Sequence, residues 1–177
     1  MSRVYFEIPT IESKQDVWEF RETFEAPSYI TNIPGASGLE KAPSYEQWLE
    51  MLKAYQNTET LPPGKVLSTT FLVRRAEDRQ MIGIVNIRHE LNEHLLAVGG
   101  HVGYSIGPEY RGKGYGTELL RVALAFCESL HLEKVLVTCD ARNSASAGVI
   151  QANGGVLENE VRDGESVKRR YWITLRP

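Results

Sequence analysis

Hydrophobic and polar residues alternate with two different periods along the 177-residue chain, and the period changes several times. Apolar side chains at every second position predict strands, whereas apolar positions three and four residues apart predict amphipathic helices. The resulting order is a strand, two helices, three strands, a helix, a strand, a helix and a terminal hairpin, which predicts one α/β domain spanning 1–177. The predicted strands are 3–8, 66–75, 80–90, 99–106, 134–140 and the two arms of 155–175, and the predicted helices lie within 13–26, 45–56, 115–132 and 144–152.

Short polar signals mark where several of these elements begin or turn. Ser44 with Gln47 forms a capping-box pattern ahead of the second helix, and Asn143 is a favourable N-cap for the last helix. Asp163-Gly164 lies between two strand-like runs and predicts a hairpin turn. The segment 27–44 is rich in Pro, Gly and Ser and predicts an ordered but irregular loop.

Composition limits the class of protein. Hydrophobic residues make up 42% and charged residues 24% of the chain, which is enough for one core without metal or disulfide support. The formal charge of −3 gives no global reason to expect nucleic acid or an anionic membrane as partner. No apolar run resembles a signal peptide or a membrane span, so we expect a cytoplasmic protein. Cys127 and Cys139 do not form a CxxC pair, and we expect reduced, buried thiols.

Three glycines, Gly112, Gly114 and Gly116, lie between a predicted strand and a predicted helix. Helix-start N–H groups and the helix dipole favour anions, and glycine lets the backbone approach a ligand closely. Arg111 and Lys113 add positive charge to an otherwise acidic protein. This junction therefore predicts a phosphate-binding loop.

The spacing of the loop excludes two familiar nucleotide motifs. A Walker A reading of 107–114 fails because Gly114 replaces the Ser or Thr that would hold magnesium. A dinucleotide reading fails because Thr117 stands where the third glycine belongs. The pattern that fits is Arg111-x-x-Gly114-x-Gly116.

With this pattern the sequence resembles the GNAT acetyltransferases, whose glycine signature wraps the pyrophosphate of acetyl-CoA. The resemblance covers about 66–175, including the strand, asparagine and helix within 134–155. Residues 87–106 and 169–173 also resemble a bacterial subgroup of predicted acetyltransferases without a known substrate. The resemblance implies the GNAT fold: a mixed, mostly antiparallel sheet of six to seven strands, splayed between the fourth and fifth strands and flanked by about four helices.

The resemblance also implies where acetyl-CoA would bind. Backbone groups of the fourth strand would bond the pantetheine arm, the glycine loop would hold the pyrophosphate, and the last helix would flank the arm. The implied binding residues are Tyr104, Ser105, Ile106, Arg111, Gly112, Lys113, Gly114, Tyr115, Gly116, Thr117, Asn143 and Ser146.

The implied reaction is direct transfer of acetyl from acetyl-CoA to a primary amine of a small molecule or peptide, and the resemblance further implies a homodimer. Ile150 stands where many relatives place a tyrosine proton donor. Two alternatives remain: an enzyme that uses a longer acyl-CoA, and a non-catalytic protein that binds coenzyme A as a sensor.

Three residues around the third and fourth strands are candidate general bases: His101, Glu90 and His89. Each also has an ordinary structural reading, as a hydrogen-bonded histidine or a solvated carboxylate. His89 and His94 are five residues apart, which does not fit the HExxH metal motif, so no metal is expected. Cys139 is read as a core thiol, with an acyl-carrying nucleophile as the alternative.

Overall fold

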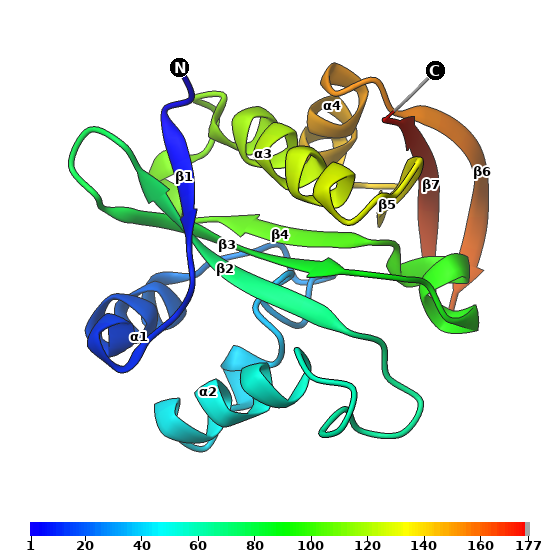
Figure 1. Cartoon of the computed structure of the whole chain (residues 1–177). Helices are drawn as coiled ribbons and strands as arrows, with labels where there is room; N and C mark the ends of the chain where they lie inside the picture. Colours follow the sequence, from blue (N-terminus) through cyan, green and yellow to red (C-terminus); the bar gives the residue numbers. More distant parts are fainter. Residues whose placement is uncertain (176–177) are drawn as a thin grey trace.

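Seven strands form two antiparallel sheets in the computed structural model, which describes residues 1–175 (Figure 1). The strand order is β1-β2-β3-β4 in the first sheet and β5-β7-β6 in the second. The first sheet contains β1 (Val4–Glu7), β2 (Ser68–Arg75), β3 (Met81–Arg88) and β4 (Val102–Ile106). The second contains β5 (Lys134–Asp140), β6 (Val156–Asp163) and β7 (Ser166–Thr174).

Helices lie on both faces of the first sheet (Figure 1). The two N-terminal helices lie on one face; the helix that follows β4 lies on the other, and the helix that follows β5 packs beside it against β5 of the second sheet. The helices are α1 (Lys14–Thr23), α2 (Tyr45–Ala54), α3 (Tyr115–Ser129) and α4 (Ser144–Ala152). This arrangement confirms the predicted α/β fold class. Within residues 1–175, no helix is both long and apolar enough to cross a membrane.

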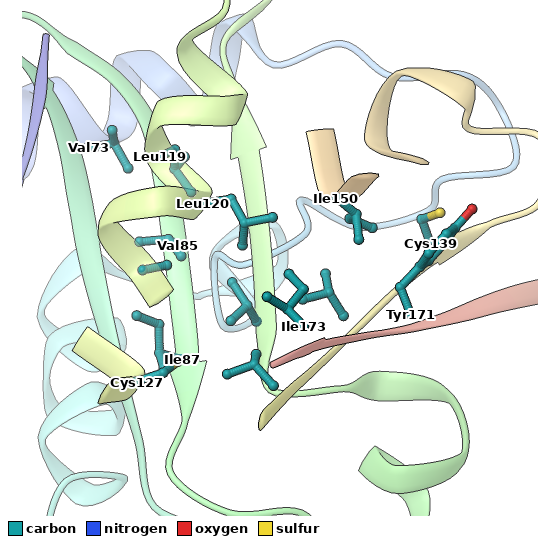
Figure 2. Packing of buried hydrophobic residues seen from close by; sticks show 14 of the residues in the cluster. Val73, Val85, Ile87, Leu119, Leu120, Cys127, Cys139, Ile150, Tyr171 and Ile173 are labelled. Carbon is teal, nitrogen blue, oxygen red and sulfur yellow. The ribbon is translucent and has the colours of Figure 1, made fainter. Parts of the chain in front are cut away.

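Two hydrophobic clusters fill the space on the two faces of the first sheet. Leu119 of α3 packs with Val85 of β3 in one cluster (Figure 2), and Trp48 of α2 packs with Ile84 of β3 in the other. Successive side chains of a strand point to opposite faces, so β3 supplies both clusters and is buried along nearly its whole length. This explains why its sequence is almost continuously apolar.

The two sheets meet where β4 approaches β5. The N–H of His101 donates to the carbonyl of Leu136 (2.7 Å), and the N–H of Leu136 donates to Nδ1 of His101 (2.9 Å). These bonds join the strands near their starts, and among the described residues no strand ladder links β4 to β5. A gap therefore opens between the sheets toward the carboxyl ends of β4 and β5.

The predicted caps and the hairpin are present. The Oγ of Ser44 accepts from the N–H of Gln47 (3.1 Å), and Gly164 lies at the β6–β7 turn with a φ of +60°. The predicted strand 99–106 starts later, at Val102, because Leu95–Gly99 forms a π-helical turn. The turn is held from outside its own sequence, since Nε of Arg170 in β7 donates to the carbonyl of Leu96 (3.1 Å).

Candidate active site

The glycine loop takes a shape that only glycine adopts without strain. Gly112 and Gly114 have φ values of +72° and +83°. Gly114 is the N-cap of α3 and has no side chain to cap it, and the first helical bond runs from the N–H of Glu118 to the Gly114 carbonyl (3.3 Å). The N–H groups of Tyr115, Gly116 and Thr117 precede that bond and lack intrahelical partners by helix geometry. This is the backbone arrangement that binds phosphate at a helix start.

The third glycine allows two helices to approach closely. A Cβ on Gly116 would lie 3.1 Å from Cγ2 of Val149 in α4. A larger side chain would therefore push α3 and α4 apart at the edge of the cleft. Because Gly116 has no side chain, the backbone of the first turn of α3 is uncovered on the side that lines the cleft.

Charged side chains hold the loop in place through backbone carbonyls. The Nε of Arg111 donates to the Ile106 carbonyl (2.9 Å), and its Nη2 donates to the Glu25 carbonyl (2.6 Å). The Nζ of Lys113 donates to the Glu109 carbonyl (2.7 Å). The two cations thus hold the loop in place. The N–H groups at the start of α3 are the donors that can bind a phosphate.

The N-terminus supports the same loop from behind. The Nη2 of Arg3 donates to the Lys113 carbonyl (3.0 Å), and its guanidinium lies 4.5 Å from the centre of the Tyr115 ring. Tyr115 is buried in the core below the loop. Sequence reasoning missed Arg3, because no local pattern relates it to a loop more than a hundred residues away.

Backbone groups of β4 alternate between the β3 ladder and the gap. Arg88 N–H donates to the His101 carbonyl (2.7 Å), and Gly107 N–H donates to the Ile82 carbonyl (2.8 Å). In an antiparallel pair every second residue bonds the partner strand, so Ser105 also faces β3. Tyr104 and Ile106 consequently direct their N–H and carbonyl groups toward the gap.

The backbone of Ser105 faces β3 and not the gap, whereas the resemblance implied that it bonds the pantetheine arm. Its backbone belongs to the β3 ladder, and its hydroxyl donates to the Pro34 carbonyl at 2.5 Å. This bond ties β4 to the irregular segment 27–44. Close by, a Cβ on Gly35 would lie 2.3 Å from the Gly103 carbonyl oxygen, so segment and strand are in direct contact.

The start of α4 faces β4 across the gap. Oδ1 of Asn143 accepts from the N–H of Ser146 (3.0 Å), which confirms the predicted N-cap. The hydroxyl of Ser146 lies 3.0 Å from the hydroxyl of Tyr104. A phenol on β4 and a hydroxyl on α4 are therefore paired, although they lie 42 residues apart in the chain.

These parts enclose a cleft of about 560 Å³. It runs from the glycine loop to the Tyr104–Ser146 pair, and the segment around Tyr29 and Pro34 covers it. Its lining in the described chain is Phe24, Ala26, Pro27, Tyr29, Ile30, Pro34, Tyr104, Ser105, Ile106, Tyr110, Arg111, Gly112, Gly114, Gly116, Thr117, Asn143, Ala145, Ser146 and Val149.

The cover segment also contacts the loop between β5 and α4. The guanidinium of Arg142 lies 4.0 Å from the centre of the Tyr29 ring. Asp140 holds Arg142 in place: one carboxylate oxygen accepts from Nε and the other from Nη2, both at 2.8 Å. This pairing lowers the pKa of the Asp140 carboxyl. Sequence reasoning did not relate Arg142 to Tyr29, because their contact crosses the fold.

The candidate bases lie outside the described lining of the cleft. His101 is buried, and it uses its ring to accept from Leu136; burial and the nearby Arg88 cation lower its pKa to about 4. Nε2 of His89 lies 2.9 Å from the hydroxyl of Thr69. Glu90 is exposed after the end of β3. The structure thus does not bring these three residues together at the cleft.

Two further residues prove to belong to the core. Ile150 has no exposed surface and lies in the cluster with Cys139 (Figure 2). Burial raises the pKa of the Cys139 thiol, which disfavours the reactive thiolate. Among the described residues, no group of three or more His, Cys, Asp or Glu side chains could hold a metal ion.

A split sheet with bare strand groups, next to a bare helix start, is an arrangement suited to a phosphate-bearing ligand with an extended arm. The chain matches a family model for the acetyltransferase (GNAT) domain over residues 3–156. It therefore belongs to the GNAT acetyltransferase family, which uses acetyl-CoA as co-substrate. No curated protein matches the chain.

Solved structures share the fold at low sequence identity. One is a protein assigned as a ribosomal-protein-serine acetyltransferase from Vibrio cholerae (18% identity, 98% of this chain and 95% of that chain, TM-score 0.69). Another is the ribosomal-protein-S5-alanine acetyltransferase from Vibrio fischeri (18%, 98% and 94%, 0.68). A third comprises mutant forms of the spermidine/spermine N-acetyltransferase SpeG from Vibrio cholerae (18%, 98% and 94%, 0.66).

Proposed function

We propose that this protein transfers the acetyl group of acetyl-CoA to a primary amine of a small molecule or peptide. The observation that carries the proposal is the continuity of the cleft, which joins the bare N–H groups of 115–117 to the gap-facing backbone of β4. Phosphate at a helix start and an amide-bearing arm along a free strand match the two chemical halves of coenzyme A. Membership of the acetyltransferase family supports the same ligand.

Transfer would proceed by direct attack of the amine on the thioester carbon. The gap-facing N–H of Tyr104 or Ile106 would donate to the thioester oxygen as negative charge develops there. The attacking nitrogen then loses its proton, the carbon–sulfur bond breaks, and coenzyme A leaves as a thiol. The joined end of the gap at His101 and Leu136 favours a short acyl group over a long one.

The lining of the cleft favours a weakly basic acceptor. In the described chain it contains no Asp, Glu or His side chain to take up a proton or to attract several positive charges. An α-amine, with a pKa near 8, is neutral at pH 7 about 200 times more often than an alkyl amine with a pKa near 10.4. We therefore place peptide or amino-acid α-amines ahead of polyamines; the similar structures include, by name, a ribosomal-protein-S5-alanine acetyltransferase and a spermidine/spermine N-acetyltransferase.

A non-catalytic coenzyme A sensor is the second candidate, because Ile150 stands where many relatives place a tyrosine proton donor. Calorimetric titration with acetyl-CoA, with ATP and NAD as controls, tests the ligand common to both proposals. Thiol release over a panel of α-amines, alkyl amines and polyamines then separates them. Binding with turnover supports the enzyme, binding without turnover supports the sensor, and absence of acetyl-CoA binding overturns both.

A further inference from the structure

Tyr104 lines the cleft, and its hydroxyl lies 3.0 Å from that of Ser146 at the start of α4. Tyr104 is two residues before the end of β4 and three residues after His101, where the gap closes. A strand rises about 3.3 Å per residue, so Tyr104 lies within about 10 Å of the closed end. Along the path from the phosphate loop into the gap, this is where the tip of a bound arm would lie.

A proton donor is missing from the position at which the resemblance implies one. Ile150 has neither a titratable group nor any exposed surface. The other two phenols of the described lining are engaged elsewhere: the Tyr29 ring lies against Arg142, and the Tyr110 ring lies 6.5 Å from that of Tyr115 below the loop. Tyr104 is thus the phenol of this lining that reaches α4 beside the gap.

We infer that Tyr104 is a catalytic residue whose hydroxyl donates a hydrogen bond to the sulfur of coenzyme A as the carbon–sulfur bond breaks, and that Ser146 positions it. The inference rests on the proposed function. The electron pair of the breaking bond goes to sulfur, and the Oη–H of Tyr104 stabilises the thiolate that forms while keeping its own proton. The Ser146 hydroxyl donates to Oη and so leaves the phenol's proton free to point at the sulfur. The proton that the attacking amine releases to water is the one that the thiolate takes up when coenzyme A leaves as a thiol.

The chemistry of the pair fits this role. Burial raises the pKa of Tyr104 to about 12, while the bond to Ser146 acts in the opposite direction. The phenol is therefore neutral at physiological pH and retains the proton through which it hydrogen-bonds the sulfur. A donor aimed at a developing negative charge stabilises the transition state more than the ground state.

Tyr104→Phe removes the hydroxyl and keeps the ring, so the fold should persist. We expect kcat for amine-dependent thiol release to fall about 100-fold, as typical for loss of a hydrogen-bond donor to developing negative charge, with the Kd for acetyl-CoA unchanged. Ser146→Ala should lower kcat by a smaller factor. Tyr45→Phe is the matched control, because Tyr45 forms a similar pair with Ser13 (2.9 Å) in the other hydrophobic cluster. It should lower stability and leave kcat unchanged.

A second readout requires no acceptor. The thiol of bound coenzyme A can be titrated through the ultraviolet absorbance of its thiolate. A hydrogen bond from Tyr104 favours the thiolate, so the pKa of the bound thiol should be lower in the wild type than in Tyr104→Phe, whereas a purely structural tyrosine would leave it unchanged.

The outcomes separate this inference from the proposed function. Equal kcat and equal thiol pKa in wild type and Tyr104→Phe overturn the assignment of Tyr104 alone. Binding without transfer overturns the proposed transferase activity, and the thiol titration still decides whether Tyr104 contacts the sulfur. Absence of coenzyme A binding by the wild type overturns both.

Discussion

The conformation of Gly114 permits a quantitative test of the phosphate loop. Its φ of +83° and ψ of 0° lie in the left-handed region, where an alanine costs about 1–2 kcal/mol more than glycine. A Cβ at this position would also lie 3.2 Å from Nη2 of Arg3, closer than most such contacts. Gly114→Ala therefore strains the loop at the point where α3 begins.

The loop is exposed, so we expect it to relieve the strain by changing shape. The N–H groups of 115–117 then leave the arrangement that binds pyrophosphate, and ligand binding has to restore it. A cost of about 1–2 kcal/mol corresponds to an affinity for acetyl-CoA that is about 5- to 30-fold weaker. Isothermal titration calorimetry of wild type and variant measures this ratio directly.

Gly64 supplies the matched control. Its φ is +77°, and a Cβ there would meet nothing within 4 Å. Gly64→Ala introduces the same backbone strain away from the cleft, so it should lower the free energy of unfolding and leave acetyl-CoA affinity unchanged. Equal affinity in Gly114→Ala and wild type would refute the assignment of the loop as the pyrophosphate site.

Three further predictions concern pH, acceptor and mechanism. Burial lowers the pKa of His101 from 6.5 to about 4, so the unfolded chain binds more protons in this range, and the free energy of unfolding should fall by about 3 kcal/mol as pH drops through it. Urea denaturation of wild type and His101→Asn checks this, and the same acid dependence in both would contradict it. An α-amine peptide should be acetylated with higher kcat/KM than spermidine at pH 7, measured by thiol release; preference for spermidine would contradict the acceptor argument. Cys139→Ala should retain turnover, and mass spectrometry should find no acetylated wild-type enzyme, whereas a trapped acyl-enzyme would restore Cys139 as nucleophile.

The sequence by itself determined the features that depend on neighbouring residues. The glycine spacing of 112–116 specifies backbone angles within one loop, and Asn143 caps a helix that begins at the next residue. Hydrophobic periodicity predicted the α-helices and those strands that bury one stripe or one face against the core, and the Asp163-Gly164 turn signal predicted the terminal hairpin, whose strand β6 is largely exposed. These signals are local, so they can be read without knowing what lies across the fold.

Tertiary structure decided which side chains face the cleft. A histidine at the start of a strand looks like a catalytic base until its ring is found accepting from Leu136. The Tyr104–Ser146 pair and the Tyr29–Arg142 contact each join distant segments. Such contacts arise from how helices and sheets pack, and no local periodicity encodes them. The sequence therefore predicts a phosphate-binding loop from local spacing alone. Which side chains lie beside the gap depends on how the two sheets separate, which the sequence does not show.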